Sequence, residues 1–301
     1  MENKKEIIKI NSIQDYLNAI ELYTGKIGYL KGKTLFRGMS HSKHALMPKV
    51  YSKKDSKESG MKYCVKESDI LDSFMKKSYA FLQNPPRDDD YQKWIAIAQH
   101  YGLPTRILDW SESCLVSLFF AVKKLNDKEN GVVWAINPSR YKKWFLSNDD
   151  ICRNDRIVKD DEVLVKLSAN RNIHSAFTDK PTGYRYPYFY YPFFIDERMK
   201  TQQSVFMVWG NDKMPLDRIE NTQIMEYTKD NKTKYSSLQN GDYIWQDGEF
   251  LLKLIINKKK KKYIKKQLDL CGINEYSIFP TLDTFGNYLN EQYSFDGFEH
   301  L

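Results

Sequence analysis

The chain has 301 residues, of which 41% are hydrophobic and 14% aromatic, a composition that predicts a folded globular protein and argues against intrinsic disorder. Its 47 lysines and arginines outnumber its 39 aspartates and glutamates, which gives a net charge of +8. The longest apolar run, residues 114–122, is too short to cross a bilayer, and the first residues carry no secretory signal, so we expect a cytoplasmic protein with no membrane contact. The four cysteines lie far apart without CxxC spacing, which argues against a zinc site or a disulfide framework, and no metal site is predicted.

In chain order, the spacing of apolar residues alternates between helical and extended periods. It predicts helices at residues 7–23, 63–82, 91–100, 113–124, 141–171, 260–271 and 282–289. Short apolar runs predict strands at 34–37, 131–137, 204–209 and 250–256, and a run of aromatics with two prolines predicts an extended segment at 183–194. We expect Gly38 to stop the first strand and Gly102 to end the third helix. The pattern predicts one α+β domain, in which a helical N-terminal half packs on a small mixed or antiparallel sheet.

Most of the net positive charge lies in one late segment. Residues 250–273 contain eight lysines and one aspartate, whereas residues 274–301 contain five acids and neither lysine nor arginine. Such a run is typical of a solvated helix face or loop. The alternative is a surface that contacts the phosphate backbone of a nucleic acid, through Lys258, Lys259, Lys260, Lys261 and Lys262.

The sequence lacks the common nucleotide and hydrolase motifs. No GxxxxGK[ST], GxGxxG, HExxH or GxSxG pattern is present, which argues against P-loop, Rossmann, zincin and α/β-hydrolase chemistry.

A first polar cluster is Phe36-Arg37-Gly38, where an arginine lies at the end of a predicted strand. Burying its charge without a partner is costly, so it needs an anion. One interpretation is a salt bridge to an aspartate or glutamate of the same chain. The other is a phosphate clamp, in which the guanidinium binds the anion and Gly38 permits its close approach.

A second cluster, residues 99–110, places many polar side chains between two apolar helices. A helix-turn-helix corner explains Gly102 and Asp109, with Arg106 and Asp109 close enough to pair and Asp109 able to cap the next helix. It explains His100, Tyr101 and Thr105 poorly. Such a density of polar groups at a helix-to-loop junction is typical of the lining of a ligand pocket.

A third cluster, residues 198–206, leads directly into a predicted strand. It is either a solvated loop or a segment whose Gln202 presents its amide to a cleft.

These clusters resemble the motifs of the FRG domain, which is named after Phe-Arg-Gly. The likeness includes His-Tyr-Gly-Leu-Pro-Thr-Arg-Ile-Leu-Asp-Trp at 100–110, R-x-x-x-Q-x-x-x-F at 198–206 and Ile-Phe-Pro-Thr-Leu at 278–282. It therefore runs from about residue 15 to 293 and implies a single FRG domain over 1–301, with residues 1–14 as an N-terminal extension. Two departures are Ser204, where the family usually has glycine, and the lysine run.

The order of the clusters is similar to the layout of ADP-ribosyltransferases, and this resemblance implies a split sheet and NAD as co-substrate. By analogy, Arg37 holds the pyrophosphate, His100 or Tyr101 contacts the nicotinamide ribose, and Thr105 takes the Ser/Thr role. Gln202 stands where those enzymes have a glutamate, and an amide cannot stabilise an oxocarbenium centre as a carboxylate does. Candidates for the missing acid are Asp109, Glu197 and Glu249. The full set expected to bind the nucleotide is Arg37, Gly38, His100, Tyr101, Arg106, Asp109 and Arg198.

Two classes of function follow. The first is an NAD-dependent ADP-ribosyltransferase-like enzyme that modifies a protein or nucleic acid, in the role of a toxin or phage-defence effector that the family resemblance implies. The second is a non-catalytic nucleic-acid-binding or interaction module, with the lysine run for charge and the aromatics of residues 184–194 for stacking.

Overall fold

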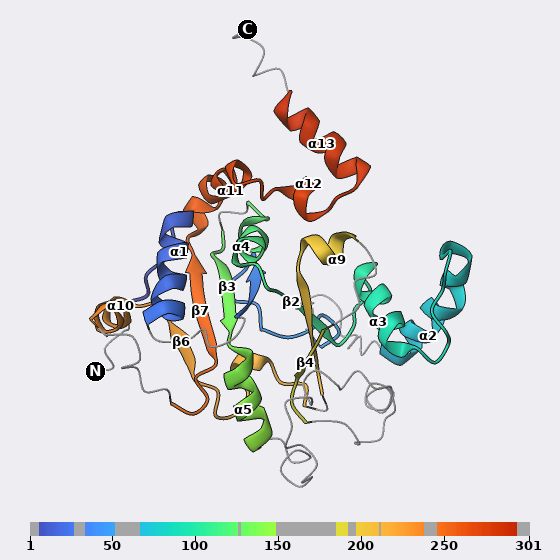
Figure 1. The fold of residues 1–301 in the computed structure, drawn as a ribbon, viewed down its shortest axis with the longest axis horizontal. Helices are drawn as coiled ribbons and strands as arrows, with labels where there is room; N and C mark the ends of the chain where they lie inside the picture. The colour runs from blue at the N-terminus through green and yellow to red at the C-terminus, as the bar shows by residue number, and fades with distance from the viewer. Residues whose placement is uncertain are drawn as a thin grey trace.

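The computed structural model describes residues 6–26, 34–51, 67–125, 128–148, 185–191, 197–210, 212–237 and 246–293. These ranges contain seven strands: β1 (Leu35–Met39), β2 (Ile107–Ser111), β3 (Gly131–Ile136), β4 (Tyr188–Tyr190), β5 (Ser204–Val208), β6 (Ile224–Glu226) and β7 (Leu251–Ile256). They also contain ten α-helices: α1 (Ile13–Glu21), α2 (Glu67–Ser78), α3 (Tyr91–His100), α4 (Cys114–Val122), α5 (Pro138–Asn148), α9 (Glu197–Thr201), α10 (Lys229–Ser236), α11 (Lys261–Leu270), α12 (Glu275–Ile278) and α13 (Leu282–Gln292) (Figure 1).

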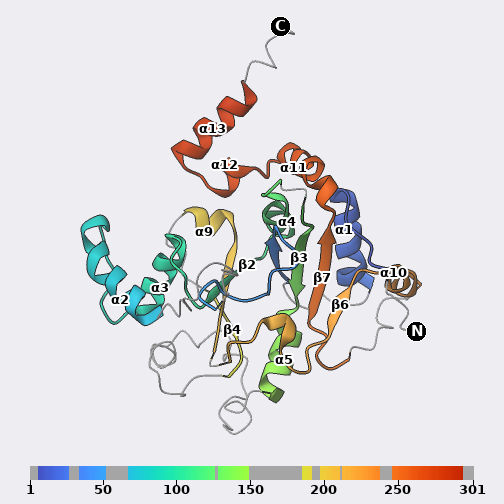
Figure 2. The same cartoon turned by 180° about the vertical axis from the view of Figure 1, so that it is seen from behind.

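All seven strands belong to one sheet, in the order β4-β5-β2-β1-β3-β7-β6. Every neighbouring pair is antiparallel except β6 and β7, so the sheet is mixed. Helices α1 and α10 lie at the β6 end, and α2 and α3 lie at the opposite end (Figures 1 and 2). The α+β class is confirmed, whereas the split sheet implied by the transferase resemblance is not confirmed among the described strands.

The alternation of side chains along each strand divides the core between the two faces of the sheet. On one face, Phe36 and Val133 pack with buried residues of α1, α4 and α11. On the other face, Leu35 and Trp134 pack with buried residues of α3 and α5. Because Arg37 follows Phe36 and lies opposite Trp134 in β3, it belongs to the second face.

Close packing of α4 on the sheet depends on two glycines. A Cβ atom at Gly38 would lie 1.7 Å from the carbonyl oxygen of Ser117, and one at Gly131 would lie 2.4 Å from that of Ala121. Only glycine therefore fits at either place. Gly38 does not stop the first strand as predicted, because β1 continues to Met39 and pairs with β3 along its whole length.

Three other differences from the sequence prediction have tertiary causes. The first helix begins at Ile13 and not at residue 7, because Ile7 and Ile10 form isolated β-bridges with Thr228 and Ile256. The helix-turn-helix corner that was one interpretation of the cluster at residues 99–110 is not formed, because Ile107–Ser111 is strand β2, which pairs with β1 and β5. As β1, β2 and β3 all precede residue 137, the described part of the first half contributes three strands to the sheet as well as helices, and the sheet of seven described strands is not small.

The remaining expected elements appear near their predicted positions. Helix α5 covers the start of the polar helix expected at 141–171, and residues 149–171 lie outside the described residues. Strand β4 confirms the extended character of 183–194 at its three residues. None of the described helices combines the length and the apolar character needed to cross a lipid bilayer.

Candidate functional site

Arg37 occupies the middle of β1, and its half-buried guanidinium is incompletely satisfied. Its Nη1 donates a hydrogen bond to the main-chain oxygen of Asp109 in β2. Its Nε is enclosed by protein and has no hydrogen-bond partner. Burial lowers the pKa of the guanidinium, and the Asp109 carboxylate opposes that shift. No ion pair joins Arg37 to a carboxylate in the described part of the chain, so the interpretation as an internal salt bridge is not supported.

Arg37 lines a pocket of about 470 Å³ at the junction of β1, β2, the end of α3 and α9. Three cationic side chains line it, Arg37, Lys49 and Arg198, with Asp109 as the one carboxylate of the lining. Gln99, His100 and Tyr101 add polar groups, and Gly102, Ile107 and Leu108 complete the lining. This balance of charge suits an anion that also carries a cationic or electron-poor centre. Among the described residues, no three His, Cys, Asp or Glu side chains are grouped so that they could hold a metal ion.

The end of α3 brings His100 and Tyr101 to this pocket. The Asp90 side chain caps the start of the helix by accepting from the Lys93 N–H, and Gly102, with φ of +84°, ends it in the left-handed conformation that glycine adopts without strain. Tyr101 is 64% exposed, and its ring meets that of His100 edge to face at 5.0 Å. The sequence correctly predicted both ends of this helix.

A chain of hydrogen bonds orients Asp109. The buried Thr105 hydroxyl donates to Gln99 Oε1, and Gln99 Nε2 donates to Asp109 Oδ2 at 2.8 Å. Thr105 does not line the pocket and acts on it only through Gln99. Gln99 begins the second cluster but was not among the predicted site residues, although its position one residue before His100, at the end of the same helix, was a usable signal.

Arg106 lies outside the pocket lining and does not pair with Asp109 as expected. Its Nε contacts Glu67 Oε2 at 2.5 Å, and its main-chain N–H donates to Glu67 Oε1 at 2.5 Å. Both side chains are largely buried, at 13% and 7% exposure. The pair joins α2 to the start of β2. Arg106 therefore makes a structural contact and is not one of the pocket residues, contrary to its prediction as a nucleotide ligand.

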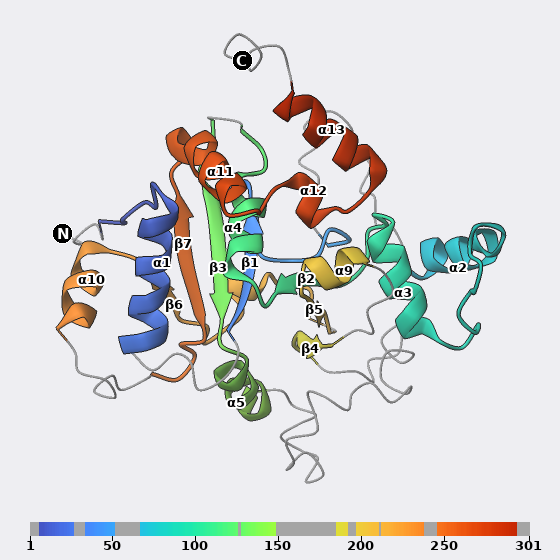
Figure 3. The same cartoon turned by 45° about the horizontal axis from the view of Figure 1, so that its top comes forward.

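The third cluster divides between two places. Arg198 Nη1 donates to the His100 carbonyl at 3.3 Å, which holds the guanidinium at the pocket. Gln202 lies outside the lining, and its Nε2 contacts the carbonyl of Ile278 at 3.4 Å. Helix α9 thus lies beside α12, whose last residue, Ile278, is the first of the closing motif (Figure 3). The structure does not bring Gln202 together with Arg37 and His100, contrary to the predicted cleft.

The other expected acids also lie elsewhere. Glu197 is exposed and 3.7 Å from Lys200, and Glu249 accepts a hydrogen bond from the Gln246 main chain. Neither lines the pocket, which leaves Asp109 as the acid that shares it with Arg37. Gly38 is absent from the lining as well, because its open side faces α4.

Lys49 was missed because nothing in the sequence around it marks a site. It lies in the irregular segment between β1 and α2, where only the folded chain brings it beside Arg37.

The lysine run forms the turn before α11 and the start of that helix. Lys259, Lys260 and Lys262 are exposed and Lys258 is partly exposed, as expected for a charged surface. Lys261 is only 1% exposed, and its Nζ donates to the carbonyl of Ser40 at 2.7 Å. Its ammonium group is therefore out of reach of a nucleic acid, which corrects its inclusion in the predicted surface.

A family model described as the FRG domain matches residues 32–130. Nine of the ten residues that line the Arg37 pocket fall within this span, and the tenth is Arg198. The third cluster and the closing motif lie beyond the matched residues. No curated protein and no solved structure matches the chain.

Proposed function

We propose that the chain, which contains an FRG domain at residues 32–130, binds NAD in the Arg37 pocket and transfers its ADP-ribose to an acceptor. The observation that carries the proposal is the guanidinium of Arg37, which has no carboxylate partner among the described residues and lines a pocket with two further cationic side chains. A diphosphate bound in the pocket would neutralise this positive charge.

The three cations fit a diphosphate better than a single carboxylate ligand. Arg37 and Arg198 offer planar guanidinium groups that match phosphate oxygens in pairs, and Lys49 adds a point charge. Ile107 and Leu108 of the lining are buried apolar residues, and an apolar wall strengthens each of these interactions.

Asp109 takes the role that Gln202 does not fill. In the proposed reaction, the bond between ribose C1′ and the nicotinamide nitrogen breaks, and nicotinamide leaves with the bonding electrons as a neutral molecule. The acceptor nucleophile bonds to C1′ and loses its proton to solvent. The Asp109 carboxylate stabilises the positive charge that develops on the ribose, as carboxylates do in glycoside cleavage. Gln99 and Thr105 are positioning residues, because they hold Asp109 by hydrogen bonds.

Binding is tested first, by titrating the full chain with inorganic pyrophosphate and with NAD. Arg37→Met should weaken both by at least about 30-fold, because it removes a buried charge that pairs with the ligand. Lys262→Met removes an exposed charge of the same sign and should leave both affinities unchanged. If the wild-type chain binds neither ligand, or if Arg37→Met binds pyrophosphate as the wild type does, the proposal is wrong.

Chemistry is tested by release of nicotinamide and by transfer of label from NAD to a mixture of cell proteins and nucleic acids. Asp109→Asn keeps the shape and the contact to Gln99 but removes the charge, and it should lower the rate on the order of 100-fold without loss of NAD binding. Asp283→Asn, at an exposed position of α13, is the control. NAD that binds but is never cleaved would limit the site to nucleotide binding and would refute the transferase proposal.

A second candidate function rests on the three exposed lysines at 259, 260 and 262. A nucleic-acid-binding surface there would bind DNA or RNA with an affinity that falls steeply as salt rises. Replacing the three lysines by methionine would then flatten the salt dependence, whereas Arg37→Met would not alter it. The acceptor of ADP-ribose, the cytoplasmic location and the toxin or phage-defence role remain predictions.

A further inference from the structure

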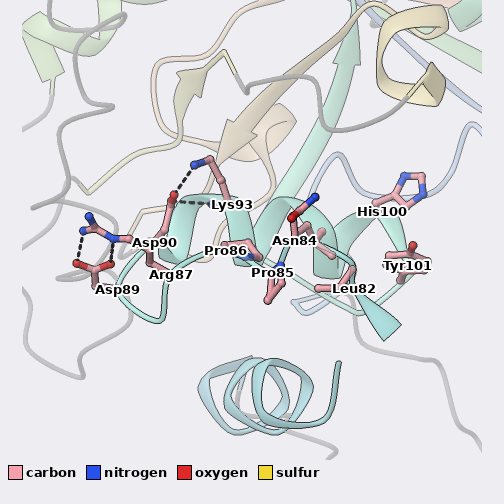
Figure 4. A pocket seen from close by; sticks show the side chains of 11 residues that line it. Leu82, Asn84, Pro85, Pro86, Arg87, Asp89, Asp90, Lys93, His100 and Tyr101 are labelled. Carbon is pink, nitrogen blue, oxygen red and sulfur yellow. Dashed lines mark hydrogen bonds and ion pairs between the residues drawn. The ribbon is translucent and has the colours of Figure 1, made fainter. Parts of the chain in front are cut away.

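A second hollow, of about 740 Å³, adjoins the Arg37 pocket. It lies between α3 and the segment of residues 82–90 that precedes the helix (Figure 4). The two hollows share His100 and Tyr101, which line both of them. The two hollows are therefore neighbours that meet at these two side chains.

The residues of this second hollow separate into two groups (Figure 4). At the end away from Tyr101, Arg87 pairs with Asp89 at 2.7 Å and Lys93 pairs with Asp90 at 2.8 Å. Four charges thus neutralise one another in pairs. The end near Tyr101 carries no charged pair and is formed by apolar, aromatic and amide groups, among them Leu82 and Asn84.

Tyr101 is an exposed aromatic residue that is held at the end of helix α3. Its main-chain N–H donates to the carbonyl of Ile97 at 3.0 Å, so the residue continues the hydrogen bonding of α3. Its ring contacts His100 edge to face at 5.0 Å, yet 64% of the residue is exposed. An aromatic ring fixed in this way offers an open face, and stacking on such a face is a general means of binding nucleobases.

We propose that the end of this hollow near Tyr101 binds the adenine of the nucleotide whose diphosphate lies in the Arg37 pocket, an inference that rests on the proposed function. The base stacks on Tyr101, and Leu82 and Ile97 supply its apolar wall. The Asn84 amide has both a donor and an acceptor, which is the pattern that an adenine edge requires. At the end away from Tyr101, the positive charges of Arg87 and Lys93 are neutralised by Asp89 and Asp90, which disfavours the binding of a further phosphate there.

The test compares ligands with and without adenine on the full chain: inorganic pyrophosphate, nicotinamide mononucleotide, ADP-ribose and NAD. Tyr101→Ala should weaken ADP-ribose and NAD by roughly 5- to 100-fold, the effect of losing one stacked base. It should leave pyrophosphate and nicotinamide mononucleotide within twofold of the wild type. Tyr101→Phe keeps the ring and should bind all four ligands normally. Tyr263→Ala removes another exposed tyrosine, on α11, and is the control.

The outcomes separate the two proposals. If pyrophosphate and NAD bind and respond to Arg37→Met, but Tyr101→Ala changes no affinity, the adenine subsite is wrong and the phosphate site stands. Equal weakening of all four ligands by Tyr101→Ala also overturns the subsite. If Tyr101→Ala leaves NAD binding intact and lowers only the transfer of label, the hollow receives the acceptor, which overturns the inference as well. A wild-type chain that binds none of the ligands overturns both proposals.

Discussion

The substitution Gly38→Ala tests what the glycine of Phe-Arg-Gly does. The added Cβ would lie 1.7 Å from the Ser117 carbonyl oxygen, and 2.8 Å from the main-chain nitrogen of Ala121. To bring the first contact to 3.0 Å, β1 and α4 must separate by about 1.3 Å. A gap of 0.5–1 Å already removes about a quarter to a half of the dispersion energy across a contact. We therefore expect a loss of about 3 kcal/mol or more, at the upper end of the range for overpacked cores.

The measurement is urea denaturation, with Gly286→Ala as the matched control. Gly286 lies inside α13 with no atom within 4 Å of an added Cβ. The same chemical change should there stabilise the protein by about 0.5–1 kcal/mol, because alanine favours the helix. The two variants should shift the urea midpoint in opposite directions.

One result would refute the packing explanation for Gly38. If Gly38→Ala unfolds at the urea concentration of the wild type but loses its affinity for pyrophosphate, the glycine serves the approach of the ligand. That outcome would restore the phosphate-clamp role that the sequence suggested for it.

Three further predictions concern stability. Glu67→Gln breaks the buried ion pair with Arg106 and should lower the free energy of unfolding, measured by urea denaturation, by about 3–5 kcal/mol. Asp72→Asn breaks an exposed pair and should change it by less than about 1 kcal/mol. Equal effects would contradict the burial argument. Lys261→Met removes the hydrogen bond from the buried ammonium to the Ser40 carbonyl and should cost about 1–3 kcal/mol, against about 0.5 or less for Lys262→Met. A neutral Lys261→Met would show that the ammonium is not needed there. Burial raises the pKa of Tyr23 well above its usual value of 10, so the unfolded chain ionises first and the free energy of unfolding should fall as pH rises above about 10. Tyr23→Phe should reduce that slope by up to about 1.4 kcal/mol per pH unit, and an unchanged slope would contradict the assignment.

Local signals were sufficient where an element is defined by its own caps. Helix α3 was predicted from its acidic start and from Gly102, and both act within the helix. Strand β2 was missed because its Asp109 and Ser111 favour a helix cap as strongly as a strand. Its extended form depends on pairing with β1 and β5, which come from residues about 70 before and 95 after it, and a local pattern cannot report such partners.

The site was predictable only in part for the same reason. Arg37, His100, Tyr101, Asp109 and Arg198 were singled out because charged and polar groups are unusual between apolar segments, and all five line the pocket. Which polar groups meet is decided by pairing across the sheet and by the loops. Thr105 and Gln202 lie outside the lining, where they contact Gln99 and the Ile278 carbonyl. Lys49, which nothing in the sequence marks, reaches the pocket.

The three residues of Phe-Arg-Gly serve opposite faces of the sheet. Phe36 and Gly38 face α4, one within the buried core of that face and the other against the helix backbone. Arg37 lies between them and faces the pocket. Strand alternation therefore separates the contribution of the motif to stability from its contribution to binding. Arg37→Met removes a charged hydrogen bond worth about 1.5–3 kcal/mol, but it also removes an unsatisfied donor that costs about 1–3 kcal/mol. The two terms nearly cancel, so the arginine contributes little net stability, as expected if its place in β1 serves the anion binding that we propose.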